Sequence, residues 1–274
     1  MKNNDLKLSI FYDHIVSVHQ QMNIDLKEAA LSVHKLGIDY VDLNSSYLKN
    51  AYDEVNKTLQ FADLKIGCIC HECDFGRNND ISDTKYIIDM VNELNVKKIL
   101  IIPGLISCNE MQEQEIEQMI NCVKLVSEYA DKKNIAICLE VYDNVMSPLS
   151  GKGILQFLER CDIVRCAFDT GNFSFWNEDE VSFFEKLKKK IVHVHLKDRS
   201  IVKHSGEQQV SSVNGEQYYP SPIGYGVIKI EEILKRLKLN SYKGIYSIEH
   251  YGAANQFDYI EKSVSWINSL GSVK

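Results

Sequence analysis

Four side chains of the types that bind divalent metals stand where short apolar runs end in the second half of the chain. The runs 135–139, 163–168, 191–194 and 245–248 are followed by Glu140, Asp169, His195 and Glu249. A buried strand that stops at a carboxylate or an imidazole places that group at its C-terminal end, and the C-terminal ends of parallel strands face the same way. The spacing therefore predicts one site built from four strands.

Three carboxylates and one imidazole are the ligand set of a hard or borderline ion, so we expect one divalent metal: Mn²⁺, Mg²⁺, Co²⁺ or Zn²⁺. Such an ion binds two substrate oxygens and acidifies the carbon beside a carbonyl, while a monodentate carboxylate keeps one oxygen free to act as a base.

Two alternatives stay open for the residues at these strand ends. Asp169 could instead cap the turn at Thr170 and Gly171, and His193 shares a face with His195.

Strand-like apolar runs alternate with helix-period segments along the whole chain. The expected strands cover 6–11, 38–43, 65–70, 97–102, 135–140, 163–169, 191–195 and 244–249, and the expected helices cover 26–36, 80–94, 112–133, 152–160, 178–190, 228–239 and 255–270. The first of these helices carries a capping signal, Asp25, and ends before Gly37. Eight β-then-α units over this length predict one α/β domain, 1–274, folded as a (β/α)8 TIM barrel.

Composition excludes several classes of protein. The chain has 274 residues, of which 45% are hydrophobic and 25% charged, which is enough for one large core. A formal net charge of −7 disfavours nucleic acid and anionic membrane as partners and favours a small molecule. With no long apolar run, we expect a soluble, cytoplasmic protein. Monomer and homo-oligomer both stay open.

Cysteines and one polar segment offer further interpretations. The eight cysteines are scattered, which is typical of free thiols. Cys68, Cys70 and Cys73 surround His71, but their spacing is poor for a zinc site. Residues 199–226 form a long polar stretch after the run that ends at His195, and we interpret it as a lid over the site, with a disordered loop as the alternative.

Five motifs together resemble the xylose-isomerase-like TIM-barrel superfamily, which includes sugar isomerases and epimerases, inosose dehydratases and isomerases, and barrel AP endonucleases. The motifs are CLEVYDN at 138–144, DTGN at 169–172, HVHLKD at 193–198, PIGYGVI at 222–228 and YSIEHYG at 246–252. The resemblance implies that Glu140, Asp169, His195 and Glu249 bind one metal ion. It also implies that Glu140 and Glu249 exchange protons on opposite faces of a substrate carbon.

Two departures from the family's patterns separate its branches. The endonuclease branch needs extra zinc histidines, and the matching positions here hold Ile102 and Asn172. A trinuclear nuclease is therefore disfavoured. In epimerases a histidine at the position of Asn172 contacts the substrate, and an asparagine there can donate or accept a hydrogen bond but cannot carry a proton.

Other residues near the predicted strand ends are candidates for substrate binding. They are Tyr12, His71, Asn172, Lys197 and His250. We expect a metal-dependent isomerase or epimerase that moves a proton α to the carbonyl of a keto sugar or cyclitol through an enediolate. Dehydration of an inosose, with His71 as the acid, is the alternative reaction, and a non-catalytic sugar-binding barrel is the alternative of another class.

Overall fold

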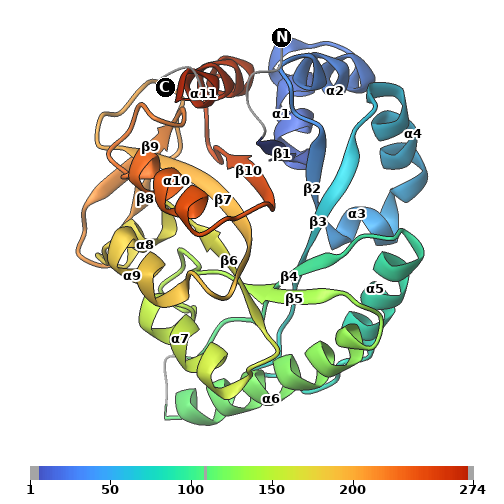
Figure 1. Ribbon diagram of the computed structural model, residues 1–274, viewed down its shortest axis with the longest axis vertical. Helices are drawn as coiled ribbons and strands as arrows, with labels where there is room; N and C mark the ends of the chain where they lie inside the picture. Colours follow the sequence, from blue (N-terminus) through green and yellow to red (C-terminus); the bar gives the residue numbers. More distant parts are fainter. Residues whose placement is uncertain (1–5, 108–109, 271–274) are drawn as a thin grey trace.

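The computed structural model describes residues 6–107 and 110–270, and these form a closed barrel of parallel strands inside a ring of helices (Figure 1). The barrel strands are β1 (Lys7–Phe11), β2 (Tyr40–Asn44), β3 (Lys65–Glu72), β4 (Lys98–Ile102), β5 (Ala136–Leu139), β6 (Arg165–Asp169), β7 (Ile191–Ser200) and β10 (Ile245–Glu249). Each strand pairs in parallel with the next, and β10 pairs with both β7 and β1, which closes the barrel. The predicted (β/α)8 architecture is confirmed.

The helices surround the strands in chain order, as the colours of Figure 1 show. They are α1 (Tyr12–Met22), α2 (Leu26–Lys35), α3 (Ser45–Asn50), α4 (Tyr52–Ala62), α5 (Ser82–Glu93), α6 (Gln112–Asp131), α7 (Gly151–Arg160), α8 (Asn172–Phe175), α9 (Glu180–Leu187), α10 (Ile230–Leu239) and α11 (Gln256–Leu270). The expected capping of α2 is present, because the Asp25 carboxylate accepts a hydrogen bond from the Lys27 N–H. Within the described ranges, no helix combines the length and apolarity needed to cross a membrane.

The two faces of the barrel strands have different chemistry. Outward residues such as Ile10, Ile99 and Val194 pack with the helices in one large apolar cluster. A much smaller cluster, formed by Cys68, Leu100, Cys138 and Ala167, lies on the opposite strand face, toward the barrel interior. The main core is therefore the layer between strands and helices, while small and polar side chains line the interior.

The strand that was expected to end at His195 continues to Ser200. That expectation was wrong because β7 gains a non-local partner: Asp198 to Ser200 pair antiparallel with β9 (Gln217–Ser221), which also pairs with β8 (Val210–Ser211). Much of the long polar stretch is therefore a hairpin that extends β7, and not the disordered loop of the alternative interpretation.

Asp198 ties the end of this stretch to the barrel. One carboxylate oxygen, Oδ2, accepts hydrogen bonds from the backbone N–H groups of Gly224 and Gly226, both at 2.9 Å, and Oδ1 accepts one from Ile228 at 3.2 Å. Gly224 has φ +87, and an added Cβ there would lie 2.1 Å from the Trp266 ring. The turn is thus fixed by one buried carboxylate and by the close approach of its backbone to α11.

We predict that Asp198→Ala destabilises the fold, because it leaves several backbone donors without their acceptor. Each buried unsatisfied donor costs about 1–3 kcal/mol, and the turn can recover part of this by opening to water. Chemical denaturation is expected to show a loss of at least 2 kcal/mol, with faster proteolysis within 200–226. Asp131→Ala, an exposed change at the end of α6, serves as the control, and equal stability of the two variants would contradict the assignment.

Candidate metal centre

Glu140, Asp169 and His195 converge at the C-terminal end of the barrel. One ligand atom from each residue lies within 4.8 Å of those of the other two, and all three residues are buried. Nδ1 of His195 lies 2.8 Å from Glu140 Oε2 and 3.3 Å from Glu249 Oε2. Asp169 and His195 are register partners on β6 and β7, so strand pairing itself places them side by side.

Asp169 both caps a turn and faces the site. Its Oδ1 accepts hydrogen bonds from the backbone N–H groups of Gly171 and Asn172, both at 2.7 Å. Its Oδ2 is left for the site. The cap and the ligand role are therefore compatible uses of one carboxylate. Gly171 allows this close turn, because an added Cβ would lie 2.8 Å from the Lys197 carbonyl oxygen.

Buried ligand atoms at this site lack hydrogen-bond partners. In the described part of the chain, Glu140 Oε2, Asp169 Oδ2 and both ring nitrogens of His195 are inaccessible and make no hydrogen bond. Their close distances without hydrogen-bond geometry indicate lone pairs aimed at a shared point. Because uncompensated buried charge is costly, these residues fit a divalent cation, and oxygen with imidazole ligands fits Mg²⁺, Mn²⁺, Co²⁺ or Zn²⁺.

Burial governs the electrostatics of the carboxylates. It raises the pKa of Asp169 to about 6 and raises the pKa of Glu140 above its ordinary value, although the nearby imidazole of His195 opposes the shift at Glu140. For His195, burial lowers the pKa, but Glu140 and Asp42 raise it more. The group thus holds its protons more tightly than free side chains do, because burial and neighbouring carboxylates disfavour the ionised forms.

The side-chain ammonium of Lys197 lies at the edge of the candidate metal site. Its ammonium contacts Glu249, its register partner across β7 and β10, and lies 3.5 Å from Asp169 Oδ2. Burial lowers the pKa of Lys197, but Asp143, Asp169 and Glu249 together raise it above its ordinary value. Lys197 is therefore a protonated hydrogen-bond donor at neutral pH.

Asn172 orients this lysine. The amide Nδ2 of Asn172 donates to the Val141 carbonyl at 2.8 Å, which leaves Oδ1 to accept from Lys197 Nζ, also at 2.8 Å. Arg199 pairs with Asp143 next to this lysine. The structure thus joins two predicted residues, Asn172 and Lys197, to the predicted ligands.

The remaining candidates make their polar contacts elsewhere. The ring of His71 lies between Ser45 Oγ at 2.8 Å and Thr84 Oγ1 at 3.1 Å, and burial lowers its pKa to about 4. The ring of Tyr12 is buried in the main core.

His250 faces α11. Its Nε2 lies 2.9 Å from Ser263 Oγ, and burial lowers its pKa to about 3. The contacts of Tyr12, His71 and His250 favour structural roles for these three residues.

Sequence reasoning missed two charged residues at or below this site. Asp42 lies in the middle of β2, and its carboxylate approaches the rings of His193 and His195. Asp143 contacts the cations of Lys197 and Arg199. The signal for Asp42 was an acidic residue inside the apolar run YVDLN, where an unpaired charge would be costly.

The cysteine cluster and a separate pocket lie outside the metal site. Among the described residues, the groups suited to a metal include none of Cys68, Cys70, Cys73 and His71, and every described cysteine is free. Cys108 lies outside the described residues.

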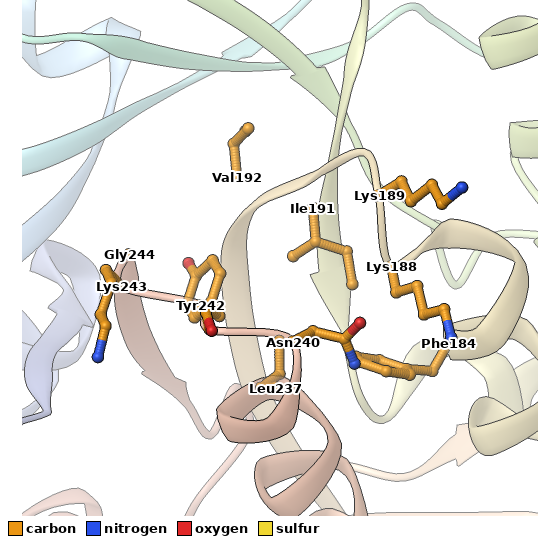
Figure 2. Close-up of a pocket in the computed structure, with 11 residues that line it drawn as sticks. Phe184, Lys188, Lys189, Ile191, Val192, Leu237, Asn240, Tyr242, Lys243 and Gly244 are labelled. Atoms are coloured by element: carbon orange, nitrogen blue, oxygen red, sulfur yellow. The ribbon is translucent and has the colours of Figure 1, made fainter.

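A pocket of about 540 Å³ opens where β7 and β10 begin, and Figure 2 shows Ile191, Tyr242 and Lys188 among its lining residues. Asp169, Lys197 and Glu249 lie at the other ends of their strands, so this pocket belongs to the opposite end of the barrel.

Comparisons with known proteins agree with this architecture. Residues 31–270 match the family model of the xylose isomerase-like TIM barrel. Inosose dehydratase 2 of Bacillus cereus is 28% identical over 172 residues, which cover 57% of this chain and 54% of that protein. The chain thus matches about half the length of this curated relative.

Solved structures share the fold at low sequence identity. A probable 3-DHS dehydratase from Bacillus anthracis superposes with a TM-score of 0.72 at 18% identity, covering 96% of this chain and 98% of its own. A D-psicose 3-epimerase from Clostridium cellulolyticum gives 0.71 at 15% identity, covering 97% and 99%. Because the family model spans most of the chain and the barrel agrees, this protein belongs to the xylose isomerase-like TIM barrel family.

Proposed function

We propose that this protein is a divalent-metal-dependent enzyme that moves a proton α to the carbonyl of a keto sugar or cyclitol. The observation that carries the proposal is the convergence of buried, unpartnered ligand atoms of Glu140, Asp169 and His195, with Glu249 beside them. A bound Mn²⁺, Mg²⁺, Co²⁺ or Zn²⁺ would polarise the carbonyl and so acidify the adjacent C–H bond. The substrate is a small molecule, and the expected compartment is the cytoplasm.

Glu140 is taken as the base, because its carboxylate borders the site and, as a monodentate ligand, would keep one oxygen free to accept a proton. It would remove the α proton and leave an enediolate. Epimerisation would follow if Glu249 starts protonated and delivers its proton to the opposite face while Glu140 keeps the abstracted one. Isomerisation would follow if Glu140 returns its proton on the same face to the neighbouring carbon and a proton moves between the two substrate oxygens. Lys197, fixed by Asn172, is placed to hydrogen-bond a substrate oxygen.

Dehydration of an inosose is the second candidate, and the similarity to an inosose dehydratase favours it. After the same deprotonation, an acid must protonate the departing β-hydroxyl. The sequence suggested His71 for this step, but its ring is occupied by Ser45 and Thr84 and its pKa of about 4 leaves it neutral. We infer that Lys197 would instead donate to the leaving oxygen in this reaction.

Metal affinity is predicted to fall as the pH decreases from 8 to 5, because Asp169 and His195 both have raised pKa values and must lose protons to bind a cation. Burial raises the pKa of Asp169 to about 6, and the ligand must lose its proton before it binds a cation. Each proton displaced reduces the apparent affinity by about tenfold per pH unit below that pKa. Titration calorimetry with Mn²⁺ from pH 5 to 8 tests this, and constant affinity across the range would contradict the assignment of Asp169 as a ligand.

Glu140→Gln is predicted to lower turnover by a factor of about 10²–10⁴, the usual contribution of a general base. It should also weaken Mn²⁺ binding, because one charged ligand is lost. The matched control is Glu159→Gln, an exposed change on α7 that should alter neither property. Metal analysis of the purified protein and assays on a panel of keto sugars and inososes provide the measurements. A protein without metal, in which Glu140→Gln changes neither ligand binding nor turnover, would support the non-catalytic barrel.

Reaction in D₂O separates the two candidate chemistries. Isomerisation or epimerisation through an enediolate should place solvent deuterium on carbon without loss of water. Dehydration should yield a product that is 18 mass units lighter, apart from any deuterium incorporated. Mass spectrometry and proton NMR of the product give the answer, and turnover with neither exchange at a carbon α to the carbonyl nor loss of water would exclude both.

A further inference from the structure

A chain of polar side chains crosses the barrel interior below the metal site. Lys98 Nζ lies 3.1 Å from His193 Nδ1, and His193 Nε2 lies 2.6 Å from Asp42 Oδ2. The same Asp42 oxygen lies 3.3 Å from His195 Nε2. Because these residues come from β4, β7 and β2, which are not neighbours in the barrel, they meet only by pointing inward.

Lysine fixes the direction of the hydrogen bonds in this chain. An ammonium group donates and never accepts, so Nδ1 of His193 must be the acceptor. In the neutral imidazole the proton is then on Nε2, which donates to the Asp42 carboxylate. Ser9 Oγ donates to the other Asp42 oxygen at 2.8 Å. Both Asp42 oxygens thus accept hydrogen bonds, one from Ser9 and one from His193.

His195 presents its two ring nitrogens to different surroundings. Nε2 faces the Asp42 carboxylate, whereas Nδ1 faces Glu140 and Glu249. A carboxylate beside Nε2 favours the tautomer with the proton on that nitrogen, which leaves the lone pair on Nδ1. The 3.3 Å separation of Nε2 and Asp42 Oδ2 is an electrostatic contact without hydrogen-bond geometry. Metal-binding histidines commonly donate their other ring N–H to a carboxylate, and a small rotation of the ring would complete that bond here.

We propose that Asp42 is a positioning residue that holds His195 as the Nε2–H tautomer and so makes Nδ1 the metal-binding atom. Lys98, His193 and Ser9 in turn hold the Asp42 carboxylate in place. This inference rests on the proposed metal-dependent function.

Asp42, His193 and His195 also form a group whose ligand atoms lie within 4.8 Å of one another. Two contacts favour hydrogen bonding over a second metal ion there. The 2.6 Å separation of His193 Nε2 and Asp42 Oδ2 is that of a short hydrogen bond, and the Lys98 ammonium already contacts the His193 ring. A second cation would add positive charge beside that ammonium.

The tautomer can be measured in the unmodified protein. In protein labelled with ¹⁵N-histidine and loaded with Zn²⁺, which is diamagnetic, two-bond ¹H–¹⁵N spectra distinguish protonated, unprotonated and metal-bound ring nitrogens. We expect His195 with Nε2 protonated and Nδ1 metal-bound, and His193 with Nε2 protonated. Metal on Nε2 of His195, or a proton on its Nδ1, would overturn the proposal.

Asp42→Asn tests the consequence for the metal. Loss of the carboxylate should weaken Mn²⁺ binding by about 10–100-fold, as for other outer-shell partners of metal ligands, and should alter the ring signals of His195. Asp63→Asn is the matched control, since it makes the same change at an exposed site on a left-handed backbone that asparagine tolerates. Circular dichroism establishes that both variants are folded.

The outcomes separate the two proposals. Tight Mn²⁺ binding by the unmodified protein and by folded Asp42→Asn alike would overturn the role of Asp42 and leave the proposed function standing. Absence of Mn²⁺, Mg²⁺, Co²⁺ and Zn²⁺ binding by the unmodified protein would overturn the proposed function and, with it, this inference. If Asp42→Asn does not fold, the tautomer of His195 in the unmodified protein decides.

Discussion

Mutual repulsion among buried carboxylates is the constraint on which the rest of the site depends. Glu140, Asp169 and Glu249 surround one imidazole at the end of the barrel, where water cannot screen them. Carboxylates that face one another in a buried site either keep a proton or share a cation. Lys197 compensates part of this charge at one edge, and unpartnered oxygens remain at the centre. The chemistry proposed for this protein follows from that residual negative charge.

The fold tolerates such a site because stability and chemistry use different faces of the same strands. Outward residues build the large apolar layer with the helices, so the interior is free to carry Asp42, His193 and small side chains. Alternation along each strand keeps the two sets apart. The outer face thus carries most of the apolar packing, and the interior carries the polar groups that border the candidate site.

The barrel could be predicted from the sequence because its buried strands are short apolar runs, and four of them have a candidate ligand at or near the end. Two kinds of feature were not predicted: a helix without a local start signal, and features that depend on contacts between distant parts of the chain. Helix α1 follows β1 directly, and Phe11 makes no side-chain capping hydrogen bond, so no start signal is present. The extension of β7 depends on pairing with β9. Asp42 acquires its meaning only when β2 and β7 face each other across the interior, which no local pattern encodes.

The two glutamates are not equivalent, and this bears on how protons move. Glu249 contacts the Lys197 ammonium, whereas Glu140 contacts the imidazole of His195. Glu249 can act as a second base only if Lys197 shares or releases its hydrogen bond. A substrate oxygen that takes this hydrogen bond would free the carboxylate at the moment of binding. Lys197 would then couple substrate binding to proton exchange at Glu249. This coupling is a chemical reason for a lysine beside the Glu249 carboxylate.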